Sequence, residues 1–267
     1  MNNFQISISI ILPTINEEEN LRSLIPDLIE NITLNNIESF EIIIMDDGST
    51  DNTKELINSI NKENNSIKFF KRDNEPSLPM AIWEGINNAK SSHVLWMDAD
   101  GSMPAESVGD FIKIIKENPN QVVIGSRFAD GGAYKGILEL EEKSLFKAIF
   151  NVYKSNDTVL GMVFSNMFNR LLRFIFKSKV LDITSGFIVG KKEFFSEKSF
   201  NKSSYGEYFI YVVSDLLKSN IEIIEKGYVC ETRKYGESKT ATSLVQLIKR
   251  GYPYIKVALK VRDNNGN

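Results

Sequence analysis

Two carboxylates separated by one residue, Asp98 and Asp100, follow an apolar run at Val94 to Met97. A short apolar run of this kind is typical of a buried strand. Side chains two positions apart on an extended chain point the same way, so the two acids would lie side by side. Adjacent carboxylates repel unless a cation lies between them, and hard oxygen ligands suit Mg²⁺ or Mn²⁺. The spacing predicts a metal and phosphate site, although solvated loops after strands also carry such pairs.

A second acidic turn follows the apolar run Phe40 to Met45, and it contains Asp46, Asp47 and Asp51. Asp51 is placed to cap a following helix. Capping needs only one acid, so we expect Asp46 and Asp47 to be free to accept hydrogen bonds from a base N–H or from ribose hydroxyls. Open α/β sheets bind ligands at the carboxyl ends of their strands, which favours this interpretation over an ordinary turn.

A third polar loop follows the apolar run Ile6 to Leu12 and includes Pro13, Thr14, Asn16 and Glu17. Three expected strands therefore run into polar loops. If the strands are parallel, their carboxyl ends meet at one edge of the sheet. The three loops then predict a single cleft.

The first half of the chain alternates expected strands with expected helices, which indicates an α/β fold with a doubly wound, mostly parallel sheet and helices on both faces. The strands are expected at Ile6 to Leu12, Phe40 to Met45, Ile67 to Phe70, Val94 to Met97 and Val122 to Ile124. The helices are expected at Glu18 to Asn31, Asn52 to Asn61, Met80 to Ala89 and Glu106 to Glu117.

The pattern changes after Tyr134, and no strand is expected from there to Lys179. This segment holds a helix that is apolar nearly all round, which is typical of a buried helix or one that docks on a partner or a bilayer. Later elements are expected at Thr184 to Val189 (strand), Tyr208 to Lys218 (helix), Ile221 to Tyr228 (strand) and Ser243 to Arg262 (helix). We expect a catalytic domain at 1–239, with a helical insertion at 134–180, and a C-terminal helix and tail at 240–267.

Composition limits the class of protein. The net charge of −3 offers no general attraction to nucleic acid. The single cysteine excludes an internal disulfide and a cysteine-based zinc site. The single histidine, His93, precedes an expected strand, which disfavours a Ser-His-Asp triad.

The sequence contains no secretory signal pattern and no apolar run of the ~18 residues that a membrane span needs. The expected last helix is basic and amphipathic, so it can lie on an anionic bilayer, or it can pack on the core with a solvated basic edge. We expect a cytoplasmic protein, peripheral on the inner face of the cytoplasmic membrane if the first alternative holds. The sequence leaves an oligomer open.

The order of the motifs resembles the family 2 glycosyltransferases, and within them the dolichol-phosphate (polyprenyl-phosphate) mannosyltransferase group. The motifs are PTINEEEN, DDGSTD, MDAD, GSR at Gly125 to Arg127, DITSGF at Asp182 to Phe187, and RKYGESK at Arg233 to Lys239. The resemblance implies a GT-A fold with a nucleotide-sugar donor. It places Pro13, Asn16, Glu17, Asp46 and Asp47 around the nucleoside, Asp98 and Asp100 on the metal and diphosphate, Arg127 by the reacting centre, and Arg233, Ser238 and Lys239 at the phosphates of donor or acceptor.

The sequence departs from this pattern at four places. Ile15 stands where the family usually has tyrosine, Gly101 and Ser102 replace Leu-Gln, and PSLPMA replaces a glycine-rich turn. In the motif Ser165, Asn169, Arg173, the arginine that the family has four residues before the serine is Gly161. The transferase class survives these changes, but the assignment to mannose does not follow.

Glycosyl transfer places negative charge on the departing diphosphate, which the metal, Arg127, Arg233 and Lys239 would stabilise. A sugar hydroxyl needs a base when it attacks, whereas a phosphate monoester is already ionised. Glu207 is a candidate carboxylate on the acceptor side. Alternatively, it stabilises the start of a helix through the helix dipole. We therefore expect inverting transfer of a hexosyl group from GDP-mannose or a UDP-sugar to polyprenyl phosphate.

Two alternatives remain: transfer to a sugar hydroxyl in polysaccharide or surface-glycan synthesis, and non-catalytic binding of a nucleotide sugar. A nucleotidyltransferase or a NAD-dependent enzyme is disfavoured, because LPTINEEEN after the first expected strand has no glycine.

Overall fold

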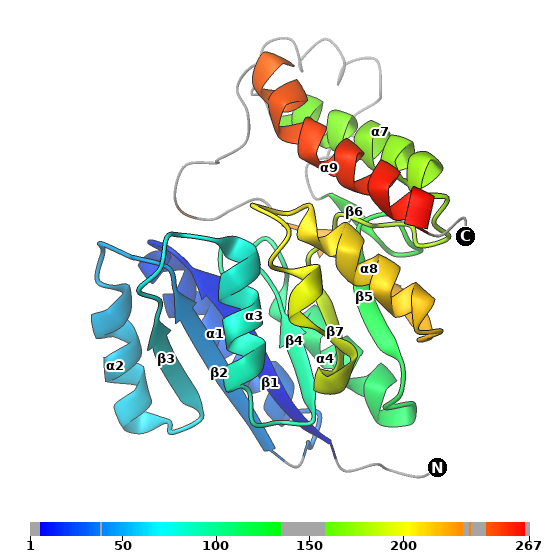
Figure 1. Ribbon diagram of the computed structural model, residues 1–267. Coiled ribbons are helices and arrows are strands. Elements are labelled where there is room, and N and C mark those ends of the chain that lie inside the picture. Colours follow the sequence, from blue (N-terminus) through cyan, green and yellow to red (C-terminus); the bar gives the residue numbers. More distant parts are fainter. Residues whose placement is uncertain (1–5, 38, 135–157, 232–234, 236–243, 265–267) are drawn as a thin grey trace, which may run out of the picture.

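The computed structural model describes residues 6–37, 39–134, 158–231, 235 and 244–264. Its centre is a seven-stranded sheet of order β3-β2-β1-β4-β7-β5-β8 (Figure 1). The strands are β1 (Ser7–Thr14), β2 (Ser39–Asp46), β3 (Ile67–Lys71), β4 (His93–Trp96), β5 (Val122–Ser126), β7 (Ile188–Lys191) and β8 (Ile223–Gly227). Only β7 runs antiparallel to its neighbours, β4 and β5. The expectation of a mostly parallel sheet is confirmed.

The register of the parallel strands brings their polar ends together. Thr14 at the end of β1 pairs with Asp46 at the end of β2, and Ile11 pairs with Trp96 at the end of β4. The next residue along, Asp47, donates its backbone N–H to the Thr14 carbonyl at 2.8 Å. The loops that follow these three strands therefore meet at one edge of the sheet, as the sequence predicted.

Helices cover both faces of the sheet (Figure 1). On one face lie α3 (Leu78–Asn88) and α8 (Tyr208–Lys218), and on the other lie α1 (Glu18–Thr33), α2 (Thr53–Glu63) and α4 (Ala105–Glu117). Consecutive strand residues therefore point into two different cores: Ile10 packs with α1 and α4, whereas Ile11 packs with α3. Burial on both faces explains why the strands read as continuous apolar runs.

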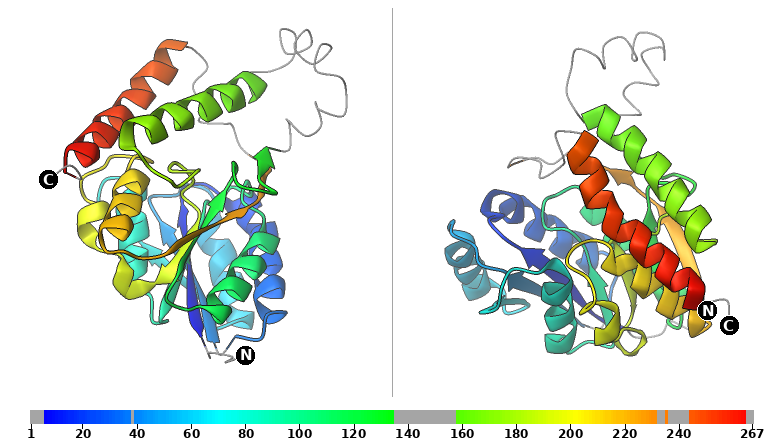
Figure 2. Two further views of the ribbon diagram at one scale, coloured as in Figure 1. Left: turned by 90° about the vertical axis from the view of Figure 1, so that its right-hand side faces the viewer. Right: turned by 45° about the horizontal axis from the view of Figure 1, so that its top comes forward.

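Two further helices, α7 (Thr158–Phe176) and α9 (Leu244–Asn264), lie side by side beyond the edge where β1, β2 and β4 end (Figures 1 and 2). Phe168 of α7 meets Tyr254 of α9 edge to face, with ring centroids 5.9 Å apart. Beneath them β6 (Ala133–Tyr134) pairs with β9 (Val229–Cys230). The short strand β6 was not expected, because two residues carry no periodic pattern.

The last helix packs on the core and exposes basic side chains. Val257, Ala258 and Val261 of α9 are buried, while Lys256 and Lys260 are exposed. One face of the helix therefore packs on the core, and its basic edge is exposed. No helix in the described ranges has an apolar stretch long enough to cross a membrane.

One expected strand lies four residues later than the sequence indicated. The expectation was Thr184 to Val189, but residues 184–187 do not belong to a strand, and β7 begins at Ile188. The Ser185 hydroxyl donates to the Gly125 carbonyl at 2.5 Å, and Gly186 has a φ of +73°. The positive φ of Gly186 lies outside the β region, so the strand begins only after this residue.

Candidate active site

A pocket of about 310 Å³ opens at the edge of the sheet where β1, β2 and β4 end. Its wall combines the loops after these strands with the start of α3 and the loop before α8. The lining residues are Pro13, Thr14, Ile15, Glu17, Asp47, Pro76, Ser77, Leu78, Asp98, Ala99, Asp100, Ser204 and Tyr205. The structure thus brings together five of the residues expected to bind the donor or the metal: Pro13, Glu17, Asp47, Asp98 and Asp100.

Asn16, Asp46 and Arg127 are not among the residues that line this pocket. Arg233, Ser238 and Lys239, expected at the phosphates, lie outside the described residues. The basic loop that holds these three residues therefore stays a prediction from the sequence.

Asn16 joins two of the loops. Its side-chain oxygen accepts the backbone N–H of Thr50 at 2.7 Å and that of Asp51 at 3.3 Å, and its own N–H donates to the Ser49 hydroxyl at 2.9 Å. Asn16 adopts a φ of 57°, a conformation that asparagine tolerates better than most residues. Its position in the structure is therefore that of a residue that orients the loops after β1 and β2.

Asp51 ties the starts of two helices together. Its carboxylate accepts the N–H of Thr53, the first residue of α2, and that of Glu18, the first residue of α1, each at 3.1 Å. Burial raises the pKa of Asp51, but the hydrogen bonds from Thr53 and Glu18 together lower it by more, so the pKa lies below its ordinary value. Asp51 thus satisfies the first N–H of α2, as expected, from the position before the cap residue Asn52.

The expectation that Asp46 and Asp47 are free was wrong. Asp46 accepts the Ser49 N–H at 3.2 Å. Asp47 binds the Arg72 guanidinium through one oxygen and the Ser77 N–H at 2.5 Å through the other. Sequence reasoning missed Arg72, which follows β3 and carries no motif. Asp47 nevertheless faces the pocket, where its remaining lone pairs can accept further hydrogen bonds.

Asp98 and Asp100 lie in the turn after β4. The Asp100 carboxylate accepts the Ser102 N–H at 2.9 Å, and Gly101 between them has a φ of +75°. No group of three or more histidine, cysteine or acidic side chains in the described ranges could hold a metal alone. Two carboxylates in one pocket fit Mg²⁺ or Mn²⁺ if a diphosphate and water supply the other oxygens. The donor set therefore fits the expected metal.

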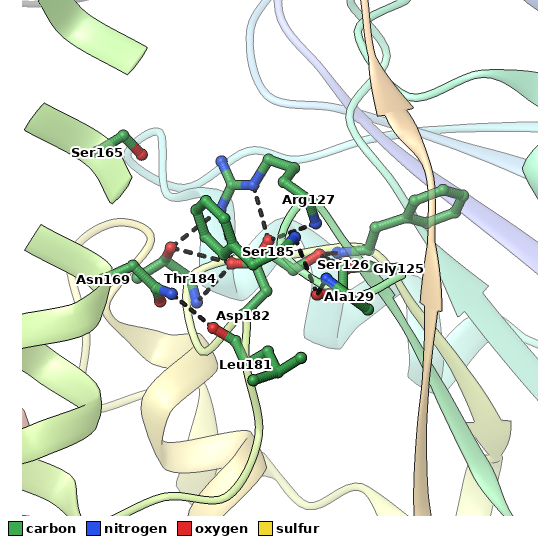
Figure 3. Close-up of polar contacts among 12 residues, drawn as sticks. Gly125, Ser126, Arg127, Ala129, Ser165, Asn169, Leu181, Asp182, Thr184 and Ser185 are labelled. Carbon is green, nitrogen blue, oxygen red and sulfur yellow. Dashed lines mark hydrogen bonds and ion pairs between the residues drawn. The ribbon is translucent and has the colours of Figure 1, made fainter. Parts of the chain in front are cut away.

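Arg127 is bound by a buried carboxylate (Figure 3). Its Nε and Nη2 donate to the two oxygens of Asp182 at 2.8 and 2.7 Å, and Nη2 also donates to the Thr184 hydroxyl at 3.0 Å. Burial lowers the pKa of Arg127, but the charge and hydrogen bonds of Asp182 outweigh it and raise the pKa well above its usual value. This guanidinium is a permanent positive charge.

The Arg127 cluster lies close to the acidic pair. Burial raises the pKa of the Cys230 thiol to about 11, against a lowering effect of Arg127 and further raising effects of Asp100 and Asp98. Tyr134, whose ring lies 5.5 Å from the Arg127 guanidinium carbon, pairs with Cys230 in the strands β6 and β9. The next residue, Glu231, donates its backbone N–H at 2.9 Å to the carbonyl of Ser102, two residues after Asp100. Arg127 is therefore connected to the turn of the acidic pair through β6 and β9, although it does not line the pocket.

Helix α7 supports the same cluster through the motif found in the sequence. Ser165 shares a hydrogen bond of 3.1 Å with the hydroxyl of Tyr134, whose ring lies 5.5 Å from the Arg127 guanidinium carbon. Asn169 donates to the Leu181 carbonyl at 2.5 Å and so holds the turn that presents Asp182 (Figure 3). Ser165 and Asn169 thus connect α7 to the Arg127 cluster.

Glu207 and His93 both form hydrogen bonds within the protein. Glu207 is 4% exposed, and its carboxylate accepts the N–H groups of Ser204 and Tyr205 at 2.8 and 3.2 Å. It therefore shapes the loop that lines the pocket. The His93 ring nitrogens bind the Ser92 hydroxyl and the Pro119 carbonyl at the start of β4, away from the pocket.

Comparisons with known proteins agree with this geometry. Residues 9–198 match the family model described as glycosyl transferase family 2. A dolichol-phosphate mannosyltransferase of Pyrococcus furiosus is 35% identical over 127 residues, which are 48% of this chain and 35% of that protein. The protein of that name from Saccharomyces cerevisiae is 27% identical over 47% of this chain and 46% of its own length. The matched segments therefore cover less than half of these relatives.

A poly-beta-1,6-N-acetyl-D-glucosamine synthase of Staphylococcus aureus is 29% identical over 66% of this chain and 41% of its own length. Among solved structures, glucosyl-3-phosphoglycerate synthase from Mycobacterium tuberculosis, in complex with Mn²⁺, UDP and phosphoglyceric acid, superposes with a TM-score of 0.62. It is 18% identical, and the match covers 96% of this chain and 78% of that one. At this identity the likeness concerns the fold, and the expected GT-A architecture is confirmed.

Proposed function

The chain belongs to glycosyl transferase family 2, and we propose that it transfers a hexosyl group from a nucleotide sugar bound in the pocket at the ends of β1, β2 and β4. One observation carries the proposal: a single pocket contains both the carboxylate of Asp47, which is held by the buried Arg72, and the acidic pair Asp98 and Asp100. The first can accept hydrogen bonds from a nucleoside, and the second suits a metal-bound diphosphate. A GDP-sugar or UDP-sugar donor fits both.

Mg²⁺ or Mn²⁺ on Asp98 and Asp100 would neutralise the charge that develops on the departing diphosphate. Arg127 adds a second, permanent positive charge beside it. Asp182 and Thr184 fix the orientation of this guanidinium, so little reorganisation is needed when the bond breaks. The chain's own residues thus stabilise the leaving group on the side away from the nucleoside.

We propose a phosphate acceptor, because the only carboxylate singled out on the acceptor side is Glu207, and it is engaged in shaping its own loop. An ionised phosphate oxygen attacks the anomeric carbon without a base. A single displacement of this kind inverts the anomeric configuration. Two relatives named as dolichol-phosphate mannosyltransferases support polyprenyl phosphate as the acceptor.

The surface of α7 supports a lipid-linked acceptor. Met167, Leu171 and Phe174, spaced four and three residues apart, are 62%, 46% and 80% exposed, so they form one apolar stripe. Exposed lysines of α9 lie on the neighbouring helix. We propose that the stripe and these lysines rest on an anionic bilayer. Phe174→Ser should weaken sedimentation with anionic vesicles, whereas unchanged sedimentation would contradict membrane contact through α7.

A second acceptor class has its own support. The Staphylococcus aureus relative is named as a polysaccharide synthase, and this chain carries Gly161 where relatives of the mannosyltransferase group have arginine. Transfer to a sugar hydroxyl would then require Glu207 as a base. The two candidate functions differ in the variant Glu207→Gln, which retains substantial activity if the acceptor is a phosphate.

The test is a panel of GDP-mannose and UDP-sugars with Mn²⁺ or Mg²⁺, in which donor consumption is measured with and without polyprenyl phosphate. We expect acceptor-dependent consumption of one donor and a loss of at least ~10²-fold in Asp100→Ala. Full activity of Asp100→Ala, or in EDTA, would overturn the metal assignment. Transfer to a soluble sugar only, with near-total loss in Glu207→Gln, would favour the polysaccharide alternative.

A further inference from the structure

The pocket has one wall that neither the motifs nor the proposed chemistry uses: the loop before α8, with Ser204 and Tyr205. Both residues are exposed, and Tyr205, the large aromatic one, is 57% exposed. A large aromatic side chain exposed at a pocket next to a diphosphate site is a typical recognition element.

Three sets of contacts fix this loop. The Glu207 carboxylate accepts the N–H of Tyr205 and both the N–H and the hydroxyl of Ser204. Gly206 lies so close to α9 that a Cβ at this position would collide with the hydroxyl oxygen of Tyr254. Tyr254 is itself held in the α7–α9 pair by Phe168. The backbone of Tyr205 is therefore prepositioned before a ligand binds.

The third set of contacts connects the loop to the acidic pair. Trp96, the last residue of β4 and two residues before Asp98, donates its indole N–H to the Tyr208 hydroxyl at 2.9 Å. Tyr208 is the first residue of α8, three positions after Tyr205. Tyr205 thus belongs to the end of the pocket formed by β4, whereas Asp47 and Ser77 mark the opposite end, formed by β2 and α3.

This order along the pocket indicates which part of the donor lies at Tyr205. If the nucleoside lies by Asp47 and the diphosphate by Asp98 and Asp100, the hexosyl group extends beyond the acidic pair. A pyranose presents C–H groups of partial positive charge on its faces and hydroxyls at its rim. The negative π-face of a tyrosine ring can pack against these C–H groups, and its hydroxyl can form hydrogen bonds with the sugar hydroxyls.

We infer that Tyr205 binds the hexosyl group of the donor, with Glu207, Gly206 and Tyr254 as its positioning residues. This inference rests on the proposed function. The phenol ring would contact the sugar in the ground state and in the transition state, so its loss weakens sugar binding without changing nucleoside recognition.

The test is calorimetric titration with two probe pairs in the presence of Mn²⁺: UDP-glucose against UDP, and GDP-mannose against GDP. For the pair that the unmodified protein binds, Tyr205→Ala should raise the Kd of the nucleotide sugar about tenfold and leave that of the nucleoside diphosphate within about twofold. The Kd of the nucleotide sugar for Tyr205→Phe should lie between the values for the unmodified protein and for Tyr205→Ala. The matched control is Tyr252→Ala on α9, an exposed tyrosine outside the pocket, which should change neither Kd.

Equal weakening of both members of a pair would place Tyr205 on the nucleoside and overturn the inference. No change in either Kd would overturn it as well. Failure of the unmodified protein to bind any of the four probes would overturn the proposed function and the inference together, so the two failures are distinguishable.

The positioning residues are tested by rescue. Gly206→Ala should reproduce the selective loss of nucleotide-sugar affinity, because the new methyl group pushes the loop away from Tyr254. The next atom that the methyl would meet is the ring carbon Cζ of Tyr254, at 3.3 Å. Adding Tyr254→Phe removes the colliding oxygen and should restore the affinity to within about threefold. A double variant as weak as Gly206→Ala would contradict the role of Tyr254.

Discussion

Two buried arginine–aspartate pairs lie at the site, and they present opposite charges to it. In the pair Arg72–Asp47 the side chains are 2% and 8% exposed, and the carboxylate faces the pocket. In the pair Arg127–Asp182 they are 14% and 0% exposed, so the guanidinium is the accessible partner. The same ion pair thus yields a fixed hydrogen-bond acceptor at one place and a fixed positive charge at the other, depending on which partner is buried deeper.

The largest expected effect comes from removing the deeper partner of the second pair. Asp182→Ala leaves the Arg127 guanidinium without its carboxylate, and the free energy of unfolding should fall by about 3–5 kcal/mol in a urea titration. The matched control is Asp110→Ala, because Asp110 pairs with Lys113 and Lys226 at the surface. That variant should stay within about 0.5 kcal/mol of the unmodified protein. Equal losses of stability in the two variants would show that the burial of Asp182 does not set its contribution apart from that of a surface ion pair.

Arg127→Lys tests the accessible charge. Lysine keeps the charge but cannot form the forked contact with Asp182. We expect turnover to fall about 10²-fold, while the Kd of the nucleoside diphosphate stays within about twofold. If both quantities change by the same factor, Arg127 acts in donor binding and not on the developing charge.

Asp47→Asn tests the accessible carboxylate of the first pair. Asparagine can still accept the Ser77 N–H, but it loses the charge that binds Arg72 and one acceptor in the pocket. The Kd of the nucleoside diphosphate should rise about tenfold, as measured by calorimetry. Glu84→Gln is the control, since Glu84 also binds Arg72 at 3.0 Å but does not line the pocket. An equal effect of Glu84→Gln would show that Asp47 acts only through Arg72.

The smallest effect concerns a carboxylate held by backbone N–H groups and not by an arginine. The pKa of Asp51 is lowered from its ordinary value of 3.8, so its contribution to stability is complete above that pH. The contribution is lost as the pH falls through the lower value of the folded state. Asp51→Asn should therefore show a smaller loss of stability between about pH 5 and 2 than the unmodified protein. Identical pH profiles would show that the hydrogen bonds to Thr53 and Glu18 add no net stability.

The sequence predicted those parts of the site that depend on local patterns. The apolar runs placed β1, β2 and β4, and the rule for parallel sheets placed Asp47, Asp98 and Asp100 at one edge. The prediction failed where a distant partner decides the outcome. Arg72 binds Asp47 from a different loop, and nothing in the acidic turn indicates it.

The same limitation applies to the strand expected at Thr184 to Val189. Its start is displaced because Gly186 has a positive φ and Ser185 binds the carbonyl of Gly125, sixty residues away in the chain. Tyr205 was missed for a related reason. Its place in the pocket depends on contacts of Tyr208 with Trp96 and of Gly206 with Tyr254, and spacing along the chain reveals neither.

The antiparallel strand β7 has a consequence for the order in which the chain can fold. β5 pairs only with β7 and β8 among the described strands, and β7 separates it from β4. The block β3-β2-β1-β4 can therefore assemble from residues 7–96, whereas β5 must wait for residues that are synthesised much later. Contacts between distant segments form slowly. We expect a nascent chain to complete the side of the pocket that carries Asp47 first, and to gain the Tyr205 wall only when α9 has emerged to meet it.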